Sequence, residues 1–244
     1  MEPTTAWRTR ALEGYAGPTR DGALPKHMDH MTSFPNVYEP SDDTYLFVDV
    51  VRSLGSVLRD VIFARERALC CLEVGSGSGT LSAVLLEELR PRGAFGLLSD
   101  CNAQACLASQ QTLRDNGLGG SGNALRCDLI PELHPSQACD VFMFNPPYVP
   151  TASEEVDRHG FGGLEAAWAG GLHGREVLNR LLPQLAKAMR EKSVVFILAV
   201  EENRPDEIAG FLERELGYVC YMAGQRRAMN ERLLVIMAVR GTEL

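Results

Sequence analysis

The sequence predicts one α/β domain with a mostly parallel sheet, and two features carry that prediction. Apolar runs of strand length alternate with amphipathic stretches of helix length from residue 41 onward. The runs are continuously apolar, which is typical of parallel strands that helices cover on both faces. The last two runs, at 218–222 and 233–239, are joined by a polar link too short for a crossover helix. They are therefore expected to be antiparallel neighbours.

Seven strands and the helices between them follow in a regular order. The strands are predicted at 69–74, 95–100, 124–127, 140–144, 193–200, 218–222 and 233–239. Helices are predicted at 81–89, 103–113, 176–189 and 205–215, after a first helix that begins near residue 41. Ser41 can cap that first helix, and Asp42 and Asp43 suit its positive first turn.

The first 35 residues differ from the rest of the chain. They carry Gly, Pro, Thr and scattered charge without periodicity, and we expect a mobile tail at 1–35 ahead of a single domain at 36–244. The first thirty residues lack the apolar core of a secretory signal. No stretch of the sequence approaches the ~20 apolar residues that span a bilayer.

Charge and cysteine content narrow the class of function. The formal net charge of −8 argues against a free-standing nucleic-acid binder and suits a basic partner or a basic segment of a protein substrate. The seven cysteines are odd in number and show no Cys-x-x-Cys spacing. They are expected to be reduced, in a cytoplasmic or nuclear protein, and no metal site is predicted.

A glycine-rich turn follows the first predicted strand, in the run Glu73-Val74-Gly75-Ser76-Gly77-Ser78-Gly79. Open α/β sheets bind ligands at this position, and glycines let the backbone approach a ligand closely. The dehydrogenase pattern would need a glycine where Thr80 stands. Glu73 would also repel a pyrophosphate, whereas it suits the cationic amino-acid end of S-adenosylmethionine.

Two further carboxylates end neighbouring strands. Asp100 follows the turn by roughly 25 residues and can accept both hydroxyls of a ribose. Asp128 ends the third strand, where a carboxylate can reach the adenine amino group. Without the glycine turn, Asp100 could equally be a structural strand-end or capping residue. The adenine role of Asp128 is favoured over a structural one, although on weaker grounds.

The fourth predicted strand ends at the loop formed by Asn145, Pro146, Pro147 and Tyr148. The two prolines restrict the backbone and remove two donors, so the carbonyls of Asn145 and Pro146 can face a substrate. The Asn145 side-chain oxygen is another acceptor, and the Tyr148 ring can pack on a planar group. The loop therefore indicates methyl transfer to a planar nitrogen, either an amide or an exocyclic amine.

These residues resemble the HemK-like branch of class I methyltransferases, and within it the eukaryotic glutamine methyltransferases of peptide-chain release factors. Besides the catalytic loop and the glycine turn, the similarity includes 37–44, 164–171 and 174–177. The class I fold has seven strands with the last one reversed, as predicted above. The segment before Phe34, the Cys101-Asn102-Ala103 run and the basic link at 225–230 depart from the family pattern.

The resemblance implies an S-adenosylmethionine-dependent enzyme that methylates the glutamine of a Gly-Gly-Gln loop. It implies that Thr44 contacts the methionine part of the cofactor and that the site is completed by Glu73, Gly75, Gly77, Asp100, Asp128 and Asn145. It also implies a heterodimer with a small zinc-binding activator subunit, the zinc belonging to that partner. We predict that the activator covers the third strand, which lies at the sheet edge in this fold.

Other functions remain open at this stage. Adenine-N6 methylation of DNA fits the same acceptor loop, although it would need a basic channel beside the site. Lysine methylation of a histone and a non-catalytic binding module are the remaining alternatives. Bland structural roles are favoured for His159, His173, Trp168, Arg175 and Glu176, and the roles of Arg226 and Arg227 are left open.

Overall fold

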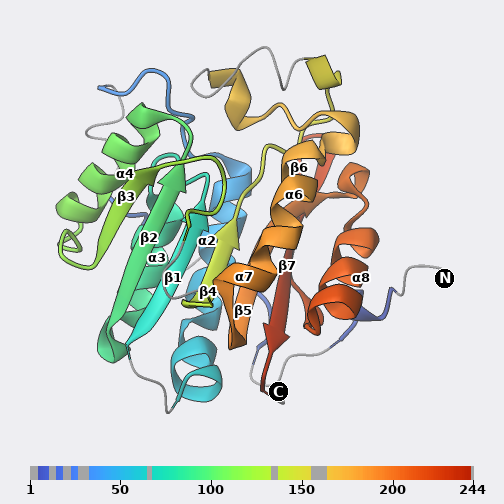
Figure 1. The fold of residues 1–244 in the computed structure, drawn as a ribbon, viewed down its shortest axis with the longest axis horizontal. Coiled ribbons are helices and arrows are strands. Elements are labelled where there is room, and N and C mark those ends of the chain that lie inside the picture. The colour runs from blue at the N-terminus through green and yellow to red at the C-terminus, as the bar shows by residue number, and fades with distance from the viewer. Residues whose placement is uncertain are drawn as a thin grey trace.

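The computed structural model describes residues 5–10, 15–18, 23–26, 33–64, 68–132, 137–154 and 164–242. Within them, seven strands form one sheet in the order β3-β2-β1-β4-β5-β7-β6 (Figure 1). The strands are β1 (Leu69–Val74), β2 (Ala94–Asp100), β3 (Gly122–Arg126), β4 (Cys139–Phe144), β5 (Met189–Val200), β6 (Val219–Ala228) and β7 (Glu231–Arg240). This confirms the predicted seven-stranded α/β fold.

The direction of the strands also agrees with the prediction. Strands β1 to β5 pair in parallel, whereas β7 is antiparallel to both β5 and β6. The hairpin between β6 and β7 is tighter than expected, because both strands extend into the predicted link and only Met229 and Asn230 connect them. The third strand lies at the edge of the sheet, as predicted.

Helices cover both faces of the sheet. The α-helices in the described residues are α2 (Asp42–Ser56), α3 (Thr80–Leu89), α4 (Ala103–Asp115), α6 (Glu176–Leu181), α7 (Leu185–Ala188) and α8 (Pro205–Leu216). Short 3-10 helices lie at Ala6–Arg8, Arg90–Arg92, Leu164–Ala167, Leu172–Gly174, Leu182–Gln184 and Glu201–Asn203, and a π-helical segment lies at Val57–Ile62. The helix predicted at 176–189 is broken, because Pro183 sits in the 3-10 segment between α6 and α7.

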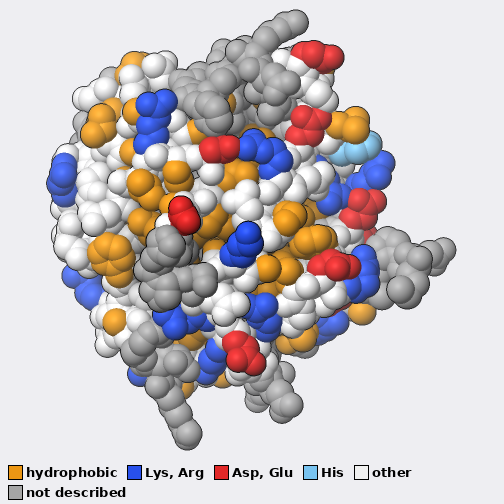
Figure 2. Space-filling model, viewed as in Figure 1, with side chains coloured by type: hydrophobic (Ala, Val, Ile, Leu, Met, Phe, Trp, Pro, Cys, Tyr) orange, Lys and Arg blue, Asp and Glu red, His pale blue; other side chains and the backbone are white. Residues whose placement is uncertain are grey.

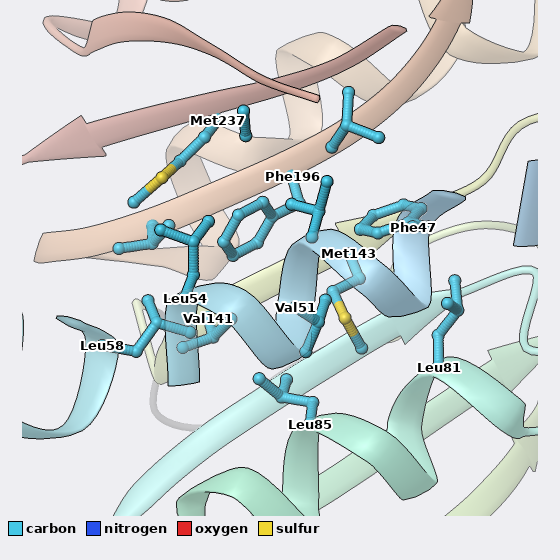
Figure 3. Packing of buried hydrophobic residues seen from close by; sticks show 14 of the residues in the cluster. Phe47, Val51, Leu54, Leu58, Leu81, Leu85, Val141, Met143, Phe196 and Met237 are labelled. Carbon is cyan, nitrogen blue, oxygen red and sulfur yellow. The ribbon is translucent and has the colours of Figure 1, made fainter. Parts of the chain in front are cut away.

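Two apolar clusters hold these helices on the sheet. Figure 3 shows the first, where side chains of α2 and α3 meet side chains of the central strands. Phe47 of α2 lies beside Phe196 of β5, with ring centroids 6.3 Å apart. The second cluster packs α6, α7 and α8 on the opposite face. Residues 194–200 of β5 alternate between the two clusters, which explains why this part of the strand is continuously apolar.

Residues 5–10, named here the N-terminal strap, pack against the domain. The sequence predicts them as part of a mobile tail; the structure instead buries Trp7 completely in the second apolar cluster. Its indole nitrogen donates to Asp206 at 2.8 Å, and Arg8 pairs with both Glu201 and Asp206. Arg10 pairs with Glu213 of α8. The strap thus lies along α8, beside the edge strand β6.

Basic and acidic side chains are interspersed among the described residues drawn in Figure 2. Among the described residues, no helix has the length and apolarity to cross a membrane. The seven cysteines are free thiols, three of them buried.

Candidate active site

A cavity of about 350 Å³ opens at the carboxyl ends of β1, β2 and β4. These strands flank the point where the chain order of the sheet reverses, which is the usual ligand site of an open α/β sheet. Every residue assigned to the site from the sequence lines this cavity: Thr44, Glu73, Gly75, Gly77, Asp100, Asp128, Asn145, Pro146, Pro147 and Tyr148. The structure therefore brings all of them together, and their individual roles stay predictions.

The glycine turn connects β1 to α3 and holds the cavity floor. Gly77 has φ +49°, a left-handed conformation that glycine adopts without strain. Its backbone N–H donates to the Asp100 carboxylate at 3.0 Å, and Ser76 N–H donates to the carbonyl of Ser99. The turn and the end of β2 are thereby fixed relative to each other.

Glu73 is buried beneath the turn, with 3% of its surface exposed. The backbone N–H and the hydroxyl of Ser82 both donate to its carboxylate. Burial raises the pKa of Glu73 to about 8, the Ser82 hydrogen bonds partly offset that rise, and nearby Asp100 adds to it. A cationic ligand beside Glu73 would favour its ionised form.

Asp100 and Asp128, which the sequence predicts to bind the adenosine part of the cofactor, both line the cavity. Burial raises the pKa of Asp100, although backbone N–H groups of Gly77 and Asn102 donate to it and lower the pKa. Asp128 forms an ion pair with Arg180 of α6 at the cavity wall. An adenine amino group would have to share the Asp128 carboxylate with this arginine.

The loop of residues 145–148 holds an acceptor that has no hydrogen-bond partner among the described residues. Asn145 Nδ2 donates to Asp43 Oδ2 at 2.8 Å, while Asn145 Oδ1 is buried without a hydrogen bond. A buried amide oxygen left unpaired is costly, so it marks a position where a ligand N–H is needed. Tyr148 packs against the first apolar cluster, and burial together with nearby Asp43 raises the pKa of its phenol.

Asn203 fixes the other end of the loop and was not found from the sequence. Its Nδ2 donates to the carbonyls of Tyr148 and His173, both at 2.8 Å, and its Oδ1 accepts from Val200 N–H. Asn203 is 1% exposed. It stands 55 residues from Tyr148 in the chain, so no local pattern could reveal the contact. The sequence predicts Asp43 only as a helix-start acid, whereas the structure shows that it also contacts Asn145.

Most residues given bland roles behave accordingly. His173 Nε2 lies 3.0 Å from an Arg204 nitrogen, and Arg175 pairs with Glu207. Glu176 accepts from the backbone of Leu172. Trp168 lines the cavity, Arg226 pairs with Asp49, and His159 lies outside the described residues.

Comparison with known proteins gives the family. The family model described as "Methyltransferase small domain" matches residues 56–158. The human protein "Methyltransferase HEMK2" is 34% identical over 206 residues, which cover 84% of this chain and 90% of the human one. The chain belongs to the HEMK2 family of methyltransferases.

Other HEMK2-type relatives and solved structures agree. The fission-yeast protein "eRF1 methyltransferase catalytic subunit mtq2" is 30% identical, over 86% of this chain and 92% of the yeast one. The Mtq2–Trm112 complex of E. cuniculi, described as responsible for methylation of the termination factor eRF1, matches with a TM-score of 0.55 and 26% identity. That match covers 84% of this chain and 99% of the other. A ribosomal protein L11 methylase of Lactobacillus delbrueckii shares the fold alone, at 18% identity and a TM-score of 0.53.

This HEMK2-type enzyme uses S-adenosylmethionine, and its cavity fits that cofactor. The cofactor supplies an electrophilic methyl group on a sulfonium when it is bound. Glu73 would hold the cationic end of the cofactor with its buried carboxyl, Asp100 would hold the ribose, and Thr44 lines the cavity beside them. The unpaired Asn145 Oδ1 lies in the same wall of residues.

Cofactor affinity is expected to rise with pH up to about pH 8. Because the pKa of Glu73 is about 8 in the free enzyme, the carboxyl is mostly protonated below that pH. The cationic cofactor favours the carboxylate, so binding releases a proton, and Kd should fall by up to about tenfold per pH unit in this window. Above pH 8 the cofactor's own amino group begins to lose its charge.

Calorimetry at pH 6, 7 and 8 in buffers of different ionisation enthalpy measures both Kd and the released proton. Glu73→Gln should flatten the profile. Glu88→Gln is the matched control, because burial also raises the pKa of Glu88 but this residue lies outside the cavity. A wild-type Kd independent of pH would rule out this role of Glu73.

Proposed function

We propose that this enzyme methylates the side-chain amide nitrogen of the glutamine in the Gly-Gly-Gln loop of a peptide-chain release factor. The observation that carries the proposal is the buried, unpaired Oδ1 of Asn145 in the Asn-Pro-Pro-Tyr loop. A primary amide presents a planar N–H pair that such an acceptor can bind. The relatives support this substrate, since two of those named above carry eRF1 in their descriptions.

The loop would promote transfer by binding the reacting nitrogen more tightly in the transition state. An amide nitrogen is a weak nucleophile because its lone pair is delocalised. Asn145 Oδ1 and a neighbouring backbone carbonyl accept its two N–H groups and hold the nitrogen in line with the methyl group. These hydrogen bonds strengthen as the nitrogen gains positive charge. No strong base is needed beforehand, because the proton can leave after transfer.

The test is methyl transfer from labelled cofactor to four acceptors, with and without a small zinc-binding activator subunit. The acceptors are a release-factor domain, its Gln→Ala variant, a histone peptide and a DNA duplex. Label on the release factor that disappears in the Gln→Ala variant is the expected result. Equal or faster labelling of the histone peptide or of DNA would replace glutamine by lysine or adenine as the substrate.

We also propose that the activator subunit covers the edge strand β3. At both edges of the sheet, other parts of the chain bond to backbone groups of the edge strand. At the β6 edge, Tyr15 Oη donates to the carbonyl of Ala223 and Arg10 to that of Cys220, so other parts of the chain use backbone acceptors there. At the β3 edge, Leu125 of β3 and Leu107 of α4 are exposed, by 38% and 62%. The Gln110 side chain of α4 also bonds the backbone of this edge, because it accepts from Ala124 N–H at 3.1 Å and donates to the Gly122 carbonyl. The exposed apolar side chains are therefore the feature that suits coverage by a partner.

A lysine substitution at each edge of the sheet shows which edge the activator binds. Leu125→Lys should weaken activator binding by about tenfold or more, because it removes apolar area and places an unpaired charge in the interface. Val219→Lys on β6 is the matched control, since Val219 is similarly exposed at 43%. Co-purification and calorimetry with the activator measure the difference. Equal activator binding by both variants would show that the activator does not bind at β3.

A further inference from the structure

We propose that Asp43 is a positioning residue that sets the orientation of the Asn145 side-chain amide, so that Oδ1 serves as the acceptor for the substrate. This inference rests on the proposed function, because it concerns how the acceptor loop receives a planar nitrogen. Asp43 lies in the first turn of α2, 102 residues before Asn145. It reaches the loop from a different element of the fold.

The contacts of Asp43 allow only one orientation of the amide. Its Oδ2 lies 2.8 Å from Asn145 Nδ2, and Ser41 Oγ donates to its Oδ1 at 2.7 Å. Asp43 is 6% exposed. An ionised carboxylate only accepts hydrogen bonds, so the group of Asn145 that faces it must be NH₂. An amide turned by 180° would place two acceptor oxygens against each other.

The orientation matters because the two ends of an asparagine amide are chemically opposite. With NH₂ held by Asp43, Oδ1 is left as a buried acceptor without a partner in the described structure. In the reverse orientation the loop would present NH₂ to the N–H groups of the substrate, and donor would face donor. A carboxylate that favours one orientation therefore contributes to catalysis without touching the substrate.

The position of Asp43 in the fold suits this task. Ser41 occupies the cap position of α2, yet its hydroxyl donates to Asp43 and accepts no helical N–H. The expected side-chain cap is thus replaced by a contact that holds the carboxylate. The start of a helix favours negative charge, which suits a carboxylate at this position. Asp42, its exposed neighbour in the same turn, has no such contact with the loop in the described structure.

A reciprocal exchange of the pair tests the proposal in the full chain, co-expressed with the activator subunit. Asp43→Ala should lower kcat by about tenfold through loss of one buried hydrogen bond, with the Kd for cofactor little changed. Asn145→Asp should lower kcat by about a hundredfold or more, because two carboxylates then face each other. In the double variant D43N/N145D the introduced amide donates to the introduced carboxylate, whose other oxygen again accepts from the substrate.

The kcat of the double variant should therefore be about tenfold or more above that of N145D. Two independent defects would lower kcat further and could not raise it. A residue that only stabilised α2 would give no such rescue. Asp42→Ala is the matched control and should leave kcat unchanged. A folded double variant no more active than N145D, beside an active wild type, overturns the proposal.

A second measurement is independent of any acceptor. The side-chain amide protons of Asn145 should exchange slowly with solvent in wild type and faster in Asp43→Ala, as read from ¹⁵N spectra with S-adenosylhomocysteine bound. If the wild type labels no release factor, the proposed function fails, and these spectra still decide the role of Asp43. Equal exchange rates in the two proteins would overturn the proposal.

Discussion

Replacement of Asn145 by alanine is expected to lower kcat for methyl transfer by about 10²–10³-fold while leaving the Kd for the cofactor within a few-fold of wild type. A fall in kcat of this size is typical when one preorganised hydrogen-bonding group that stabilises charge in the transition state is removed. Asn145 Oδ1 is buried and unpaired in the free enzyme, so it needs no rearrangement before it accepts a substrate N–H. Glu73 and Asp100, which are expected to hold the cofactor, do not bond to the Asn145 side chain.

Single-turnover transfer to the release-factor domain, together with calorimetry of cofactor binding, separates the two effects. Asn116→Ala is the matched control, because Asn116 ends α4 away from the cavity and bonds to Lys26. It should retain wild-type turnover. Unchanged turnover in Asn145→Ala would show that the loop is only the end of a strand, and the assigned mechanism would fail.

Much of this site could be predicted because parallel strands bring their carboxyl ends to one edge of the sheet. Glu73, Asp100 and Asn145 each end or follow a continuous apolar run, and such runs are recognisable without a structure. Once the strand order is known, those residues must meet. This is why all the predicted site residues line one cavity.

The contacts that orient the site could not be predicted, because they join distant parts of the chain. Asp43 reaches Asn145 across 102 residues, and Asn203 reaches Tyr148 across 55. Asp43 has a satisfactory local explanation as a helix-start acid, and that explanation concealed its second contact. Asn203 lies in a short 3-10 helix whose sequence shows no periodicity.

The N-terminal strap shows that composition alone does not predict whether a short segment is ordered. Residues 5–10 have no periodic pattern, which favours disorder by the usual criteria. Their placement depends on charges that lie about 200 residues away. Trp7 and Arg8 both bond to Asp206, and Arg10 pairs with Glu213. A short segment can thus be placed by its partners even when its own sequence carries no signal.

Replacement of Gly174 by alanine is expected to reduce both stability and turnover strongly. Gly174 has φ +65°, and a Cβ there would stand 1.9 Å from the carbonyl oxygen of Tyr148 and 2.5 Å from Asn203 Nδ2. Both neighbours belong to the network that holds the catalytic loop, so the clash must move backbone. Overpacking and backbone strain together should cost about 3 kcal/mol or more, which corresponds to a fall in Tm of about 6–12 °C for a domain of this size.

Turnover should fall further than stability alone requires. A shift of the loop by about 1 Å can cost about 10²-fold in rate because the acceptor no longer meets the reacting nitrogen. Gly117→Ala is the matched control, since Gly117 has a similar φ of +69° but nothing within 4 Å of a Cβ. It should lose about 1 kcal/mol from backbone strain and keep its kcat. Thermal melts and kcat measured on both variants separate the effect of backbone strain, which both share, from that of the steric clash with Tyr148 and Asn203, which only Gly174→Ala has. Equal loss of kcat in the two variants would mean that the contact between Gly174 and Tyr148 does not hold the loop in place.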